Sequence, residues 1–100
     1  MSFKVIFKGK HITYSSMLYC KSDFGARPSS EIDLSLQDVA SKIQKSSTFK
    51  LELVTKSYIV LQRDETTISI MKNGEMLLQN VPRGDPKEAE RVVSELFGLL

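Results

Sequence analysis

The sequence has little of what metal, disulfide and cofactor sites need. Its 100 residues include one cysteine, one histidine, no tryptophan and five scattered glycines. The single cysteine, Cys20, excludes an intramolecular disulfide framework and suits a reducing compartment, so we expect a cytoplasmic protein. Cys20 and His11 are too few to build a tetrahedral zinc site, and the glycines form neither a Walker-type loop nor a GxGxxG motif. We therefore predict no metal and no cofactor.

Long apolar runs and an excess of one charge are also absent from the sequence. No apolar run approaches the ~20 residues that span a bilayer, and the opening MSFKVIFKGK lacks the apolar stretch of a secretory signal, so we expect no membrane contact. The net charge of +2 does not indicate a polycation that binds nucleic acid with its whole surface. The length suits one domain, which we place at residues 1–100.

Four consecutive short β-strands are predicted between residues 49 and 81, in the segments FKLELVT, KSYIVLQR, TTISIMK and NGEMLLQNV. The Asn73-Gly74 pair between two apolar runs predicts a two-residue type I′ turn. In that register Met71 faces Met76 and Ile70 faces Leu77, and opposed residues point to the same side of the sheet. The turn therefore predicts which face of the sheet each side chain occupies.

Side-chain alternation divides these four strands into a core face and a second, mixed face. The core face is predicted to carry Phe49, Leu51, Leu53, Ile59, Leu61, Ile68, Ile70 and Leu77. The second face is predicted to carry the apolar residues Val54, Tyr58, Val60, Met71, Met76 and Leu78. This second face is more apolar than a solvated face should be, so we predict that these six residues bind a partner.

Two helices are predicted from their capping signals. Ser35 is a candidate N-cap with Asp38 three residues later, and an apolar stripe extends from Leu36 to Ile43. Asp85 and Pro86 supply a second N-cap and a first-turn proline, followed by an apolar stripe that ends at Leu100. Both helices should pack on the core face.

The first thirty residues are harder to interpret. Phe3, Val5 and Phe7 alternate as the inward face of one strand. Residues 9–34 are predicted to be partly irregular, with a short strand possible at HITY and a loop over residues 21–30. From Met1 to Ser22 there are four lysines and no acidic residue. Basic residues beside aromatic ones can bind phosphates and stack bases, so nucleic-acid binding is an alternative. Its candidate residues are Lys4, Lys8, Lys10 and Lys50.

The predicted order is strand, helix, four strands, helix, an α+β two-layer sandwich with both helices on one face of an antiparallel sheet. This order, with Met71-Lys72-Asn73-Gly74-Glu75-Met76-Leu77-Leu78 and Glu88-Ala89-Glu90-Arg91-Val92-Val93, resembles one half of the TATA-box-binding protein fold. It is also similar to small archaeal proteins assigned that fold, and the closing pattern resembles the tail of some ubiquitin-activating-like adenylyltransferases.

The resemblance to the TATA-box-binding protein implies a curved sheet whose uncovered face contacts a DNA minor groove. The sequence departs from that pattern in two ways. It has a single repeat, so a dimer would be needed to form a saddle, and Glu52 on the same face would repel phosphate.

The function predicted from the sequence is a non-enzymatic binding module that uses its open sheet face for protein contact or for self-association as a homodimer. Two arrangements would cover that face without DNA: residues 9–30 fold back over it, or two chains pair through it as in the homodimer. An enzyme that used His11 and Cys20 would need the two side chains within hydrogen-bonding reach.

Overall fold

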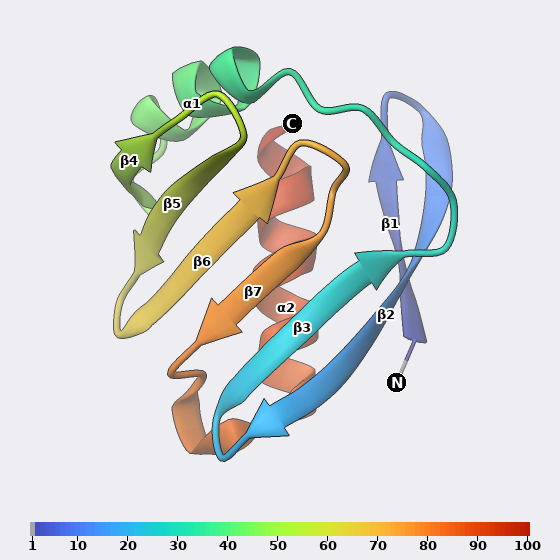
Figure 1. Ribbon diagram of the computed structural model, residues 1–100, viewed down its shortest axis with the longest axis vertical. Helices are drawn as coiled ribbons and strands as arrows, with labels where there is room; N and C mark the ends of the chain where they lie inside the picture. Colours follow the sequence, from blue (N-terminus) through green and yellow to red (C-terminus); the bar gives the residue numbers. More distant parts are fainter. Residues whose placement is uncertain (1) are drawn as a thin grey trace.

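Within residues 2–100, which the computed structural model describes, seven antiparallel strands form one open sheet with two helices on one side (Figure 1). The strands are β1 (Ser2–Phe7), β2 (Lys10–Cys20), β3 (Asp23–Pro28), β4 (Lys50–Val54), β5 (Tyr58–Arg63), β6 (Thr66–Met71) and β7 (Met76–Gln79). The helices are α1 (Leu36–Gln44) and α2 (Pro86–Leu99), and a short 3-10 turn, η1 (Pro82–Gly84), precedes α2. The spatial order of the strands is β1-β2-β3-β7-β6-β5-β4, which leaves β1 and β4 at the two edges. The α+β class with helices on one face of an antiparallel sheet is confirmed.

Both predicted helices form with the predicted caps. The Ser35 hydroxyl accepts a hydrogen bond from the Asp38 amide at 3.4 Å, and the Asp85 carboxylate accepts one from the Lys87 amide at 3.0 Å. The buried stripes are Leu36, Val39, Ala40 and Ile43 on α1 and Ala89, Val92, Val93, Leu96 and Phe97 on α2. These stripes place both helices against the same side of the sheet. In the described part of the chain, neither helix has the length and apolar character to cross a bilayer.

Aromatic side chains join α2 to the first strands. The Phe97 ring lies 5.4 Å from the Tyr14 ring and 5.8 Å from the Phe7 ring, measured between centroids. The Tyr14 hydroxyl donates a hydrogen bond of 2.7 Å to the Gly74 carbonyl, which ties β2 to the β6–β7 loop. Burial raises the pKa of the Tyr14 phenol, because a phenolate would lose its hydration there.

A half-buried arginine fixes α2 to the other half of the sheet. Arg63, at the end of β5, contacts both Glu95 oxygens at 3.1 and 3.2 Å and Glu88 at 3.4 Å. The Glu88 side chain is only 15% exposed and is paired with Arg63. A two-pronged guanidinium contact of this kind restricts the helix orientation as well as balancing charge.

The prediction that residues 9–34 are partly irregular is wrong for most of that segment. Residues 10–28 form β2 and β3, which extend the sheet instead of folding back over its face. Ile12 and Tyr14 on β2, and Phe24 and Ala26 on β3, are buried at every second position. The residues between Tyr14 and Phe24, which include three serines, a lysine and an aspartate, conceal this alternation in the sequence. The element order is therefore β-β-β-α-β-β-β-β-α, and residues 29–35 connect β3 to α1 across the top of the view (Figure 1).

The β6–β7 hairpin has a different register from the predicted one. Ile70 pairs with Met76 and Ser69 pairs with Leu77. The Gly74 amide donates to the Met71 carbonyl at 3.0 Å, so the loop contains three residues, 72–74. Gly74 has a φ of +91°, whereas Asn73 does not have the positive φ that a type I′ turn requires. A type I turn followed by a left-handed glycine accommodates Asn-Gly equally well and shifts the pairing by one residue.

This shift reverses the faces of β7, because successive side chains of a strand point to opposite sides. Met76 is 4% exposed and Leu78 is 0% exposed, both beneath the helices with Ile70 and Ile68. The prediction that Met76 and Leu78 bind a partner on the open face is therefore wrong. Leu77 points to the open face in their place.

A bulge in β4 produces a second reversal. The register shifts between Leu51 and Leu53, so that Leu53 pairs with Val60 and Val54 pairs with Ile59. Leu53 therefore shares the open face with Val60. Val54 shares the helix side with Ile59, contrary to the predicted placement, and stays exposed because β4 is an edge strand.

Candidate functional site

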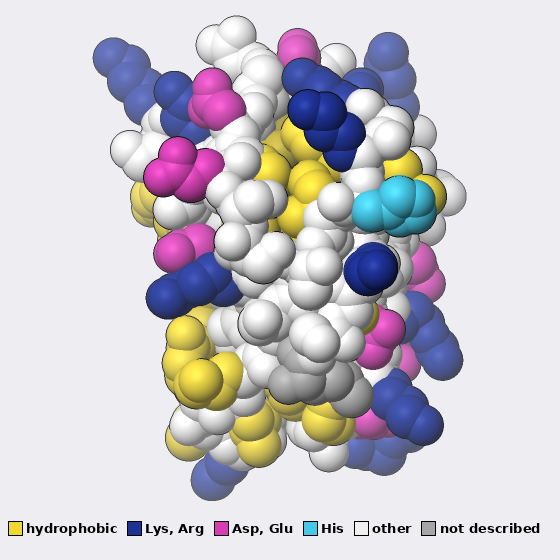
Figure 2. Space-filling model, turned by 90° about the vertical axis from the view of Figure 1, so that its right-hand side faces the viewer, with side chains coloured by type: hydrophobic (Ala, Val, Ile, Leu, Met, Phe, Trp, Pro, Cys, Tyr) yellow, Lys and Arg dark blue, Asp and Glu magenta, His cyan; other side chains and the backbone are white. Residues whose placement is uncertain are grey.

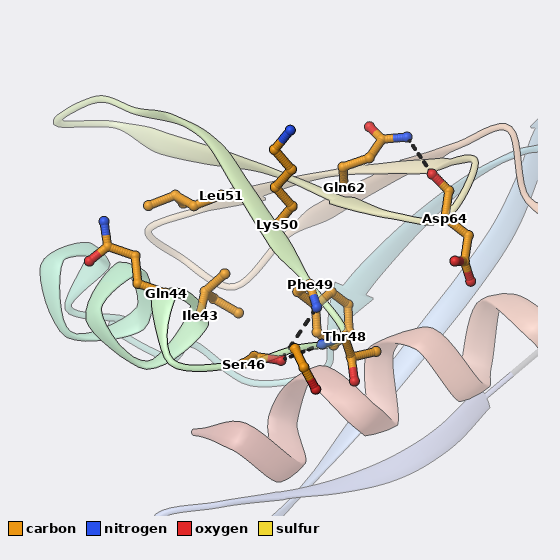
Figure 3. A pocket seen from close by; sticks show the side chains of 10 residues that line it. Ile43, Gln44, Ser46, Thr48, Phe49, Lys50, Leu51, Gln62 and Asp64 are labelled. Atoms are coloured by element: carbon orange, nitrogen blue, oxygen red, sulfur yellow. Dashed lines mark hydrogen bonds between the residues drawn. The ribbon is translucent and has the colours of Figure 1, made fainter.

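The side of the sheet that faces away from the helices is the candidate site. Near its β4 edge, Lys50 and Gln62 project to the side of the sheet opposite α2, whereas Ile43 and Phe49 lie on the helix side (Figure 3). We call the outward side the open face. The strand register arranges its side chains in three rows that cross the strands.

The central row is apolar or small at every position, and we call it the apolar row. The pairs Leu53–Val60, Val60–Ser69, Ser69–Leu77, Leu77–Gly25 and Gly25–Met17 link six strands from β4 to β2. Leu53 is 46% exposed and Met17 is 65% exposed, and Val60 and Leu77 are half-buried. The row therefore presents bulky side chains separated by two small residues, Ser69 and Gly25.

Gly25 leaves room for the side chain of Tyr19. A Cβ atom at position 25 would collide with the Tyr19 ring, which lies against the strand at this point. Even with Tyr19 in place, a hollow of about 410 Å³ remains over Gly25, between Met17, Arg27 and Glu75. A glycine inside a strand often marks a close approach of another group, and here that group is the tyrosine ring.

Polar rows flank the apolar row on both sides. The Tyr58 row contains Tyr58, Met71, Glu75, Arg27 and Ser15, with Arg27 and Glu75 paired at 3.3 Å. The Gln62 row contains Lys50, Gln62, Thr67 and Gln79, and the Thr67 hydroxyl donates to the Gln62 side-chain oxygen at 2.8 Å. An apolar centre with a polar rim is the usual composition of a protein interface.

Three of the six predicted partner-binding residues, Tyr58, Val60 and Met71, lie on the open face. Whether they bind a partner stays a prediction. The sequence analysis missed Leu53, Leu77, Met17 and Tyr19 as open-face residues. The alternation within HITYSSMLYC was the one signal that could have placed Met17 on this face. In the view of the β1–β2 side, hydrophobic side chains gather at the lower left, at the end of the β2–β3 hairpin (Figure 2).

The four lysines proposed for nucleic-acid binding do not form one stripe. Lys4 points to the open face from β1, and Lys50 does so from β4 at the opposite edge. Lys8 and Lys10 lie at the β1–β2 turn, where the Lys8 amine is 5.3 Å from the centre of the Phe7 ring. Figure 2 shows hydrophobic side chains in a hollow there, with basic side chains and the histidine around it. Glu31 and Asp33 also line this hollow of about 350 Å³, so its charge is mixed.

The hypothesis of a His11–Cys20 catalytic pair is wrong. His11 lies at the start of β2 and Cys20 at its end, nine residues further along one strand. At 3.4 Å per residue, their backbones are about 30 Å apart. Cys20 is exposed.

The hollow at the end of α1, of about 550 Å³, is built around turns (Figure 3). The Ser46 hydroxyl accepts hydrogen bonds from the Thr48 and Phe49 amides at 3.0 and 3.3 Å. The Gln62 side-chain amide donates to the Asp64 carbonyl at 2.9 Å. These hydrogen bonds hold the chain as it enters β4 and leaves β5. Within residues 2–100, no three His, Cys, Asp or Glu side chains cluster in a way that could hold a metal ion.

Comparisons of this chain with protein-family models, with curated proteins and with solved structures find no match.

Proposed function

We propose that this chain is a protein-binding module whose partner covers the open face of the sheet. The observation that carries the proposal is the apolar row, which crosses six strands on the side that neither helix covers. Single exposed apolar side chains are ordinary on protein surfaces. A continuous row with polar rims marks an interaction surface more often than it marks solvated sheet.

The arrangement of the rows supports protein contact. Leu77 and Val60 occupy the middle of the face, where a partner would remove them from water, and charged residues such as Lys50 and Arg27 lie in the flanking rows. Because the strands are held in the sheet and tied to α2 by Arg63, the face is ordered before binding. A partner would therefore bind without first ordering this backbone.

Nucleic-acid binding is the second candidate, supported by the first 22 residues without an acidic residue and by the resemblance to the TATA-box-binding protein fold. Lys4, Arg27 and Lys50 are the basic side chains of the open face, and they are spread over β1, β3 and β4. Glu75 balances Arg27. We rank this function second, because phosphate binding depends on cations gathered along one path.

Site-specific photo-crosslinking tests the proposed function. A photoreactive residue replaces Leu77 in one variant and the exposed Ser94 of α2 in a matched control, and each is irradiated in cell extract. We expect discrete crosslinked products, with the chain itself or with another protein, from position 77 and not from position 94. Excess unlabelled wild-type chain should abolish these products, whereas excess Leu77→Lys chain should not. Equal competition by the two unlabelled chains would refute a specific contact through the open face.

A further inference from the structure

We propose that the partner on the open face is a second copy of this chain, related by a two-fold axis parallel to the strands and passing between β6 and β7. This inference rests on the proposed function. It follows from the order of the strands and the register, which fix what each open-face residue would meet in a second copy. A two-fold axis makes the interface isologous, so every contact occurs twice.

The strand order determines the facing pairs. A rotation about an axis between β6 and β7 places β6 over the second copy's β7, β5 over its β3, and β4 over its β2. Because the axis runs along the strands, each row stays at its own height and faces the same row of the other copy. The apolar row of one chain therefore packs against the apolar row of the other.

Within the apolar row, this axis sets large side chains over small ones. Leu77 faces the second copy's Ser69, so each leucine enters the gap over a serine. Val60 faces its Gly25, where the Tyr19 ring leaves a hollow of about 410 Å³. Leu53 and Met17 face each other at the ends, where both are exposed. Interdigitation of this kind is how the inner faces of two stacked sheets fill the space between them.

Neighbouring axes give poorer packing. An axis along β7 would place Leu77 over itself and Ser69 over Gly25, so two leucines would collide at the centre of the interface. An axis along β6 would place Ser69 over itself and Val60 over Leu77. The alternation of bulky and small residues in the apolar row therefore selects the axis between the two strands.

The polar rows are complementary under the same rotation. The Tyr58 ring faces the second copy's Arg27, whose side chain is 71% exposed and can stack on an aromatic face while it stays paired with Glu75. In the Gln62 row, Thr67 faces Gln79. Glu75 faces Met71, and its charge is balanced by Arg27 of its own chain.

The size of the face indicates a weak dimer. Six strands spaced about 4.8 Å apart span about 24 Å, and three rows spaced by two residues cover about 20 Å along the strands. The two faces together would bury on the order of 1,000 Å², at the lower end of specific interfaces. We therefore expect a dimer that dissociates on dilution rather than an obligate one.

Exchanging the two central residues of the apolar row tests the arrangement. Ser69→Leu alone would place leucine over leucine, and Leu77→Ser alone would place serine over serine. The double variant Ser69→Leu/Leu77→Ser restores leucine over serine between copies, and it also keeps the pair Leu–Ser within the sheet. By sedimentation equilibrium, we expect each single variant to weaken dimerisation at least tenfold, and the double variant to recover it to within threefold of wild type.

Several outcomes overturn this inference. If the wild-type chain stays monomeric over a thousandfold range of concentration, the proposal of self-association is refuted. The proposed function would still stand if position 77 crosslinked to another protein. If neither single variant weakens the dimer, the dimer interface lies elsewhere on the molecule. A double variant that folds, as judged by urea unfolding, but does not recover the dimer excludes this axis.

Thiol crosslinking provides a second measurement, which leaves the residues of the apolar row unchanged. In a Cys20→Ser background, Thr67→Cys chains are mixed with Gln79→Cys chains and a short bis-maleimide crosslinker, which spans the ~10 Å between two stacked sheets. We expect the mixture to form a linked pair at least tenfold faster than a mixture of Thr67→Cys with the control Ser94→Cys on α2. Equal rates for the two mixtures would contradict the proposed facing pairs.

Discussion

Leu77 and Leu78 are adjacent in β7, yet replacing each with alanine should have very different effects on stability. Leu78 is fully buried and pairs with Phe24 on one side and Ile68 on the other. Truncating a leucine in such a position removes buried methyl groups and leaves a cavity, which costs about 2 to 5 kcal/mol. Leu77 lies between Ser69 and Gly25 on the open face, where truncation opens no enclosed cavity.

The difference should be easy to measure. Fully burying a leucine is worth about 1.5 to 3 kcal/mol, so a half-buried one should lose less than about 1 kcal/mol on truncation. A chain of this size has a total stability of about 5 to 15 kcal/mol and a urea slope of about 1 to 2 kcal/mol per molar. Leu78→Ala should therefore lower the urea midpoint by about 2 M, and Leu77→Ala by less than about 0.7 M.

The assay is urea unfolding followed by far-ultraviolet circular dichroism, at a protein concentration low enough that self-association does not contribute. Met76→Ala is a matched control, because Met76 is 4% exposed on the same face as Leu78 and should also be costly. If Leu77→Ala were as damaging as Leu78→Ala, or more so, β7 would pair in the two-residue type I′ register. The apolar row would then not exist.

Three further predictions follow from contacts elsewhere in the molecule. Tyr14→Phe should lower the free energy of unfolding by about 1 to 3 kcal/mol, because it leaves the Gly74 carbonyl without its buried donor. Burial raises the pKa of Tyr14 in the folded state, so its contribution is fully present below pH ~10 and is lost as the pH rises further. Urea unfolding at stepped pH should show wild type losing stability above pH ~10 more steeply than Tyr14→Phe, and parallel curves would contradict this. Gly74→Ala should be destabilising by about 1 kcal/mol or more, because Gly74 has a φ of +91° and a Cβ there would meet Ile32. In α2, a Cβ on Gly98 meets no other atom, so Gly98→Ala should be neutral or stabilising by about 0.5 kcal/mol. Thermal unfolding compares the two, and an equal response would refute the role of the Gly74 conformation. On duplex and single-stranded DNA columns we expect the chain to elute at low salt, with Lys4→Glu and Lys50→Glu changing its position little, because the two lysines lie on opposite edge strands. Strong retention that either substitution abolishes would favour nucleic-acid binding over protein contact.

The helices were predictable from the sequence because their signals are local. Each cap is a contact between residues two or three positions apart, such as Ser35 with Asp38 and Asp85 with Lys87. Each buried stripe repeats with the helical period, which depends on the sequence alone. The existence of β5, β6 and β7 followed in the same way from their period of two.

The second and third strands and the edges of the open face were less predictable than the first strand, which the alternation of Phe3, Val5 and Phe7 indicated. In β2, only Ile12 and Tyr14 are buried, and the other nine residues of this 11-residue strand are polar or exposed to some extent. Its strand conformation comes from pairing with β1 and β3, which supplies backbone hydrogen bonds on both sides. That pairing depends on the rest of the folded chain, so it cannot be predicted from the composition of β2 alone.

The sequence by itself determined the two helices, the antiparallel strands from β5 to β7 and the location of the hairpin at Asn73-Gly74. The tertiary structure alone decided whether that hairpin has a loop of two or three residues, and where β4 bulges. Both turns suit Asn-Gly locally, so the choice depends on whether Met76 and Leu78, or Leu77, fill the space beneath the helices. Because side chains alternate with a period of two, the one-residue difference in loop length determines which leucine is buried in the core and which lies on the open face.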